Sequence, residues 1–134
     1  MIRLKQTVIV EGRYDKARLS SLIDANILTT DGFDIFRDKR KLHTIRMLAE
    51  KDGIILLTDS DAAGFRIRGY LSGAVPPERI THVYIPDLFG KERRKNRPSA
   101  EGKLGVEGVP TKLLLEAFAR AGITPETAEQ GASD

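Results

Sequence analysis

The sequence predicts an α/β fold, an open and mostly parallel sheet of about four strands with helices on both faces. Short apolar runs alternate along the chain with charged segments whose apolar residues recur at helical spacing. Some of these runs are apolar at every position, which is typical of strands buried on both faces of a parallel sheet. With 134 residues, 40% of them hydrophobic, the chain has the size of one domain, predicted over residues 1–122.

The first half of the chain contains two predicted strands and two predicted helices. A strand is expected at Thr7–Val10, because this apolar run stops at a Glu-Gly pair. A helix is expected from about Tyr14 to Ala25, followed by a short strand at Ile27–Thr30 that ends in an Asp-Gly turn. The apolar residues of Asp38–Lys51 fall on one side of a helix, and Gly53 is expected to cap its C-terminus.

The second half continues the alternation. The strand at Gly53–Thr58, with the sequence GIILLT, is expected to lie at the centre of the sheet, because no polar residue interrupts it before Thr58. A helix is predicted at Ala62–Ser72, a further strand at Thr81–Ile85, and an amphipathic helix at Thr111–Ala121. The small and polar residues 123–134 are expected to form a loose tail.

The positive charge is concentrated in one segment, from Lys91 to Lys103. This segment holds six basic and two acidic residues, a net charge of +4, whereas the whole chain has a formal net charge of +3. A basic loop on an otherwise balanced domain indicates a polyphosphate partner such as a nucleic acid. The alternative is a solvated surface loop without a partner.

Composition excludes several other classes of site. The chain has no cysteine, which rules out disulfides, thiol nucleophiles and thiolate zinc sites. His43 and His82 have no cluster of partners and are interpreted as surface histidines. No apolar run is long enough to span a bilayer, and the first residues lack the pattern of a secretory leader. A cytoplasmic protein is therefore expected.

Three acidic residues follow two of the predicted strands. Glu11 comes at the end of the first strand, and Asp59 and Asp61 come at the end of the central one. Since parallel strands end at the same edge of a sheet, these carboxylates are expected to share one rim, where a cation such as Mg²⁺ would neutralise them. The alternative for Glu11 is a structural ion pair with Arg13 or Lys16.

Small residues accompany these acids. Gly12 and Gly64 are expected to leave room for a phosphate group beside the start of a helix. For Asp61 the alternative role is to cap the helix that follows it, which is common for an aspartate in this position.

These residues form two motifs that together resemble a known family. The run Val8–Gly12, with Asp15 four residues after the glutamate, and the run Leu57–Gly64 resemble the two signature motifs of the Toprim domain. Each motif follows an apolar strand, and the resemblance covers roughly residues 2–86.

The Toprim resemblance implies a metal-dependent reaction on a nucleic acid. It gives Glu11 the role of general acid and base and a place beside the metal. It gives Asp59 and Asp61 the role of ligands for one or two Mg²⁺ ions, for which Mn²⁺ can substitute. Such a centre suits phosphodiester cleavage, which needs an activated nucleophile and a neutralised oxyanion.

The segment Arg97–Glu107 resembles the corresponding stretch of the ribonuclease M5 family, nucleases that mature 5S ribosomal RNA. The resemblance implies an endoribonuclease that cleaves structured, double-stranded precursor RNA, with a ribosomal protein as a possible helper. Members of that family carry a further C-terminal region that helps to engage RNA.

Asp15 and Glu107 are candidates for additional acids at the site. The expected phosphate contacts are Lys91, Arg93, Arg94, Lys95, Arg97 and Lys103.

Three alternatives stay open at this point. A Toprim nuclease or primase-like protein that acts on DNA would share the same motifs. A non-catalytic RNA-binding scaffold would keep the fold, although the intact acids argue against it. A phospho-receiver domain also carries an aspartate after a central strand, but it needs paired acids after its first strand, and this chain has Glu-Gly-Arg there.

Overall fold

The computed structural model describes residues 1–85 and 110–124. The main sheet has four strands, β2 (Thr7–Val10), β4 (Ile27–Thr29), β5 (Ile54–Thr58) and β6 (Ile80–Tyr84). Their order across the sheet is β4-β2-β5-β6, and every neighbouring pair is parallel. The predicted α/β class, with a parallel sheet of four strands and β5 in its interior, is confirmed.

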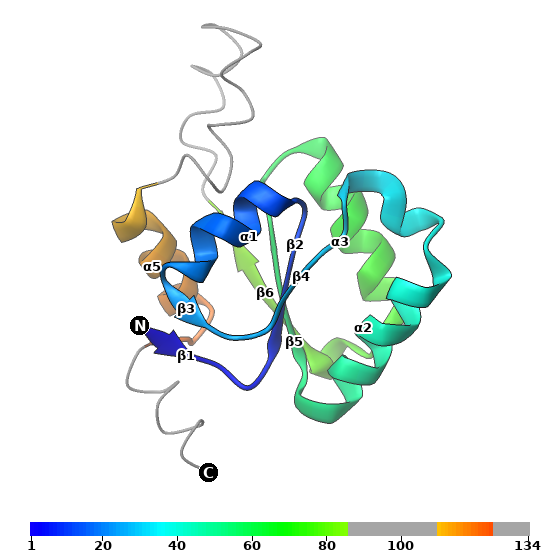
Figure 1. The fold of residues 1–134 in the computed structure, drawn as a ribbon, viewed down its shortest axis with the longest axis horizontal. Coiled ribbons are helices and arrows are strands. Elements are labelled where there is room, and N and C mark those ends of the chain that lie inside the picture. Colours follow the sequence, from blue (N-terminus) through cyan, green and yellow to red (C-terminus); the bar gives the residue numbers. More distant parts are fainter. Residues whose placement is uncertain (86–109, 125–134) are drawn as a thin grey trace, which may run out of the picture.

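Helices cover both faces of this sheet. Helices α1 (Arg13–Ser20) and α5 (Thr111–Arg120) lie on one side, and α2 (Lys39–Asp52) and α3 (Ala62–Ala74) lie on the other (Figure 1). Asp38 caps the start of α2, and Gly53, with φ of 82°, ends it as expected. Among the described residues, no helix is long and apolar enough to cross a membrane.

The sheet divides the core into two clusters because successive side chains of a strand point to opposite faces. Val8, Val10 and Leu57 pack with Phe118 of α5, whereas Ile9, Ile54 and Leu56 pack with α2 and α3. All five residues of β5 are buried. This two-sided burial explains why the sequence of β5 is apolar at successive positions.

The first helix ends earlier than predicted. Helix α1 stops at Ser20, where the hydroxyls of Ser20 and Ser21 donate to the carbonyls of Lys16 and Arg18 at 2.7 and 2.8 Å. The following residues form strand β3 (Ile23–Asp24), which pairs in parallel with β1 (Ile2–Arg3). The side chains of Ile2 and Ile23 are each 3% exposed. Burial of this pair against the core therefore overrides helix propensity.

Two short 3₁₀ helices complete the described elements, η1 (Gly32–Phe36) and η2 (Pro77–Arg79). The predicted turn after β4 is present, with Asp31 in the left-handed region at φ of 55°, but it leads directly into η1. Of the predicted tail, Ile123 and Thr124 are described, and Ile123 packs against the core cluster of α1 and α5 instead of being loose. The rest of the tail, residues 125–134, and the basic loop lie outside the described residues.

Candidate active site

The acidic residues lie where β2 and β5, neighbours in the sheet, end. Ile9 of β2 is level with Leu56 of β5, so Glu11 and Asp59, which follow these strands, reach the same rim. The backbone of Glu11 is fixed by the segment after β4, because the Gly32 N–H donates to the Glu11 carbonyl at 3.1 Å. The hydroxyl of Ser60 donates to the carbonyl of Ile85 and so ties the end of β5 to the chain after β6.

The carboxyl group of Glu11 is surrounded by other carboxylates. Burial raises its pKa from 4.5 to about 8, and the negative charges of Asp59, Asp61 and Asp15 add to this effect. A hydrogen bond with the Asp59 side chain acts in the same direction. The structure therefore brings together the four acids that the sequence singled out in this part of the chain. We call these four residues the acidic cluster.

Two members of the acidic cluster also make capping hydrogen bonds at the N-termini of helices. One carboxylate oxygen of Asp61 accepts the Gly64 N–H at 2.7 Å, and one of Asp15 accepts the Gly12 N–H at 3.0 Å. The capping alternative for Asp61 is therefore observed, and it orients the side chain rather than removing it from the rim. No ion pair within the described part of the chain joins Glu11 to Arg13 or Lys16.

The donor chemistry of the acidic cluster suits a hydrated Mg²⁺ ion. Within residues 1–85 and 110–124, no group of three His, Asp or Glu side chains is arranged to enclose a metal. Mg²⁺, however, usually keeps several waters and binds through one or two carboxylates. Burial, followed by the charges of Asp59, Asp61 and Asp15, raises the pKa of Glu11, and a nearby cation would favour its ionised form.

Gly64 packs directly against the backbone of the acidic cluster. A Cβ atom at this position would lie 2.1 Å from the carbonyl oxygen of Asp59 and 3.1 Å from its carbon. The glycine therefore allows α3 to approach the end of β5. At Gly12, leaving its two chain neighbours aside, the nearest atom to a Cβ would be a carboxylate oxygen of Asp15 at 3.9 Å, an ordinary van der Waals contact.

We expect Gly64→Ala to destabilise the fold by about 1–3 kcal/mol, because the new methyl group forces the Asp59 backbone or α3 to move. Urea denaturation would measure the change. Gly69→Ala is the matched control on the same helix, since a Cβ there meets nothing within 4 Å and alanine favours the helix. Equal stabilities of the two variants would contradict the tight approach.

A buried arginine beneath the rim was missed by sequence analysis. Arg68 of α3 is 5% exposed, and its guanidinium donates to the carbonyls of Leu56 and Val83 at 3.2 and 2.9 Å. It also donates to the hydroxyl of Thr58 at 2.9 Å. Burial lowers its pKa, and the charges of Tyr84 and Glu11 oppose this shift. Arg68 thus joins the ends of β5 and β6 next to Asp59.

The interpretation of His82 as a surface histidine was wrong. Its ring is half-buried, with Nδ1 2.7 Å from a guanidinium nitrogen of Arg68, and it stacks on Tyr84 with ring centroids 5.8 Å apart. Burial and the charge of Arg68 lower its pKa. His43, in contrast, is exposed. Neither Arg68 nor His82 belongs to a motif, so the sequence carries no signal for this contact.

The pKa of Glu11 predicts how stability depends on pH without metal. The folded chain keeps the Glu11 proton up to about pH 8, whereas the unfolded chain loses it near 4.5. The free energy of unfolding should therefore fall as pH rises, and level off above about 8. Because the pKa of His82 is lowered from 6.5, its titration makes the free energy of unfolding rise with pH, but only below about pH 6.5. The effect of Glu11 is therefore clearest between pH 6.5 and 8.

Urea denaturation in a chelator would show this slope as roughly 1 kcal/mol per pH unit, below the limiting value because the carboxyl group is partly hydrated. In Glu11→Gln the slope should disappear. A variant with the same slope as the wild type would show that another group titrates.

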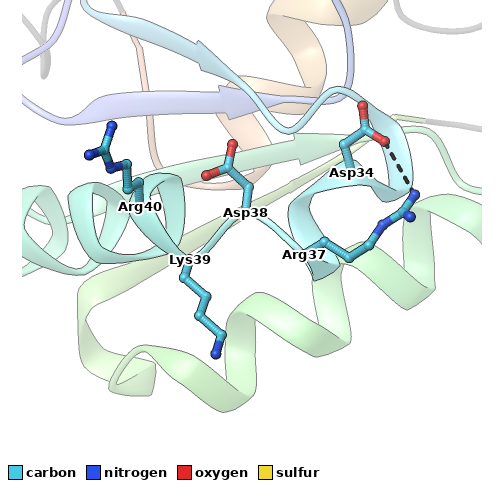
Figure 2. A pocket seen from close by; sticks show the side chains of 5 residues that line it. All are labelled: Asp34, Arg37, Asp38, Lys39 and Arg40. Atoms are coloured by element: carbon cyan, nitrogen blue, oxygen red, sulfur yellow. Dashed lines mark ion pairs between the residues drawn. The ribbon is translucent and has the colours of Figure 1, made fainter.

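A separate hollow of about 510 Å³ lies between η1 and the start of α2. Figure 2 shows its lining, in which Lys39 and Arg40 point in different directions and Arg37 lies 3.9 Å from Asp34. Its charges nearly cancel and its side chains do not converge, so it does not form a site comparable with the acidic cluster. The other expected site residues, Lys91 to Lys103 and Glu107, lie outside the described residues.

Comparison with known proteins identifies the fold and its relatives. The family model described as Toprim domain matches residues 5–84. A solved structure of a small TOPRIM domain protein from Bacillus stearothermophilus superposes with a TM-score of 0.59 and 22% identity, covering 90% of this chain and 88% of that one. This structural likeness shows the fold alone.

Curated relatives are similar to the chain over most of its length. Ribonuclease M5 of Lactococcus lactis is 35% identical over 117 residues, 87% of this chain and 52% of the relative. Ribonuclease M5 of Lactiplantibacillus plantarum is 34% identical over 119 residues, 89% of this chain and 59% of the relative. The chain thus spans little more than half the length of these proteins, and the expected resemblance to ribonuclease M5 is confirmed. Since the matched segment covers more than half of its residues, the chain belongs to the Toprim domain family.

Proposed function

We propose that this chain is the catalytic domain of a Mg²⁺-dependent endoribonuclease that cleaves structured, double-stranded precursor RNA. Its reaction would be the maturation of 5S ribosomal RNA. Two findings support the proposal, the acidic cluster at the rim of the sheet and the similarity to proteins named ribonuclease M5. The catalytic domain would extend over residues 1–122, and the protein would act in the cytoplasm. Its partners would be precursor 5S ribosomal RNA and a ribosomal protein as helper.

The observation that carries the proposal is the position of Glu11 among three aspartates. A carboxyl group with a pKa near 8 can both accept and donate a proton close to neutral pH. Glu11 would act as this general acid and base, and Asp59 and Asp61 would hold the ion, with Glu11 beside them. Bound Mg²⁺ would supply charge neutralisation at the phosphate and activation of the attacking water.

Other residues of the chain would bind the RNA backbone. Gly12, which has no side chain and precedes the first residue of α1, would let a phosphate approach beside Glu11. The space at Gly64 is filled by the Asp59 backbone, so this glycine would help only indirectly, by letting the N-terminus of α3 lie close to the phosphate. Asp15 and Glu107 would be additional acids. A-form RNA is recognised by its shape and its phosphates, which suits flexible basic side chains. The proposed phosphate contacts of the basic loop are Lys91, Arg93, Arg94, Lys95, Arg97 and Lys103.

A cleavage assay with matched RNA and DNA tests this proposal. The chain would be incubated with folded 5S ribosomal RNA precursor and with DNA of the same sequence, in Mg²⁺ or in a chelator. Discrete RNA ends that form only with Mg²⁺ support the proposal. Preferential cleavage of the DNA would instead identify a DNA-directed Toprim nuclease, and RNA binding with no cleavage of either would identify a scaffold.

A further inference from the structure

Two exposed pairs, each of an aromatic ring and an arginine, lie on either side of the acidic cluster. We propose that these pairs bind unpaired nucleobases next to the phosphodiester that is cleaved. The substrate would still be structured, double-stranded RNA, and its strand would open locally at the cut so that one or two bases reach the rings. The inference rests on the proposed function and adds to it a second binding surface.

The first pair follows Glu11 in the chain. Arg13 and Tyr14 begin α1, and the guanidinium of Arg13 lies 5.0 Å from the centroid of the Tyr14 ring. The Tyr14 side chain is 62% exposed, so it does not contribute to the core. Tyr14 follows Glu11 by three residues in the first turn of α1, so its backbone lies close to the end of β2.

The second pair lies on the other side, between η1 and α3. The guanidinium of Arg66 lies 5.0 Å from the centroid of the Phe33 ring, and Phe33 is 45% exposed. Phe33 follows Gly32, whose N–H binds the Glu11 carbonyl. Arg66 comes five residues after Asp61 on the helix that Asp61 caps. Both members of this pair are therefore tied to the acidic cluster.

The ring of Phe33 contacts a second aromatic ring, which in turn contacts a third. Phe36 lies 5.5 Å from Phe33, and Tyr70 meets Phe36 edge-on at 4.9 Å, both measured between ring centroids. Phe36 and Tyr70 are partly buried and pack against the core cluster of α2 and α3. A ring held in this way loses little conformational freedom when a base stacks on it, which favours binding.

The combination of exposed ring and guanidinium matches the chemistry of an unpaired nucleotide. An aromatic side chain stacks on the face of a base, and an arginine beside it can contact the phosphate or the base face. In a duplex, neighbouring base pairs cover these faces, so a paired base cannot use the rings. The two aromatic–arginine pairs therefore favour a duplex whose strand opens at the cut over one that stays paired there.

Binding measurements with two simple RNA probes test the inference. The probes are a labelled, short single-stranded oligoadenylate and a blunt, fully paired RNA duplex of the same length, both in Ca²⁺ to suppress cleavage. Tyr14→Leu and Phe33→Leu should each weaken single-strand binding by about 5- to 100-fold, with little change for the duplex. Met47→Leu is the control, because Met47 is 58% exposed on α2, away from the aromatic–arginine pairs, and should change neither affinity.

Unchanged single-strand affinity in both variants would overturn the inference, and so would an equal loss for single strand and duplex. Circular dichroism of each variant separates these outcomes from misfolding. The readout is also independent of cleavage. If the wild type cleaves no RNA but the variants lose single-strand affinity, the proposed function fails and the binding surface stands. If RNA cleavage depends on Glu11 while the variants bind normally, the reverse holds.

Discussion

Replacement of Arg68 by methionine is expected to destabilise the fold by roughly 3–5 kcal/mol, since three buried acceptors then lose their donor. These acceptors are the carbonyls of Leu56 and Val83 and the hydroxyl of Thr58. The guanidinium also lies 4.2 Å from the centroid of the Tyr84 ring, a contact that methionine cannot replace. Chemical denaturation would measure the loss as a lower midpoint.

Arg66→Met is the matched control for this prediction. Arg66 lies two residues earlier on α3 and is exposed, so its replacement should cost less than about 1 kcal/mol. A loss at Arg68 no larger than that at Arg66 would mean that the buried hydrogen bonds contribute little to stability.

Glu11→Gln should change activity and stability in opposite directions. Loss of the proton-transfer group is expected to lower the rate of Mg²⁺-dependent RNA cleavage by roughly 10²- to 10⁴-fold. The amide carries no charge, so it removes the repulsion with Asp59 and Asp61, and the metal-free variant should unfold at a higher denaturant concentration near pH 8. Cleavage rates and denaturation curves on the same preparation would test both parts.

Glu50→Gln provides the control for this pair of measurements. Glu50 is exposed on α2, so the same chemical change there should leave both rate and stability nearly unaltered. If Glu11→Gln loses activity but also loses stability, the carboxyl group supports the fold and its role in the reaction is not established.

The rim could be predicted from the sequence because strand burial is a local signal. The apolar run of β5 specifies two-sided burial, and the acids that follow β2 and β5 then share an edge by topology alone. The end of α1 could not be predicted in this way. It depends on burial of Ile23 beside Ile2, a contact between residues far apart in the chain.

Arg68 illustrates a second limit of the sequence. An arginine between apolar residues of a helix is usually exposed, and only the assembled sheet shows that its donors meet the carbonyls of two strands. The same holds for Phe33 and Arg66, whose contact depends on the packing of η1 against α3. The sequence also does not show that η1 lies beside Glu11, which follows from the hydrogen bond of the Gly32 N–H to the Glu11 carbonyl.

A Mg²⁺ titration of thermal unfolding at pH 8 tests most directly whether the acidic cluster binds a divalent cation. Wild type and Asp59→Asn would be compared over the millimolar range of Mg²⁺. A ligand that binds only the folded chain raises the Tm. We predict that Mg²⁺ raises the Tm of the wild type and has little effect on Asp59→Asn. An equal rise in both proteins, or no rise in the wild type, would mean that Asp59 does not hold a divalent cation in the acidic cluster.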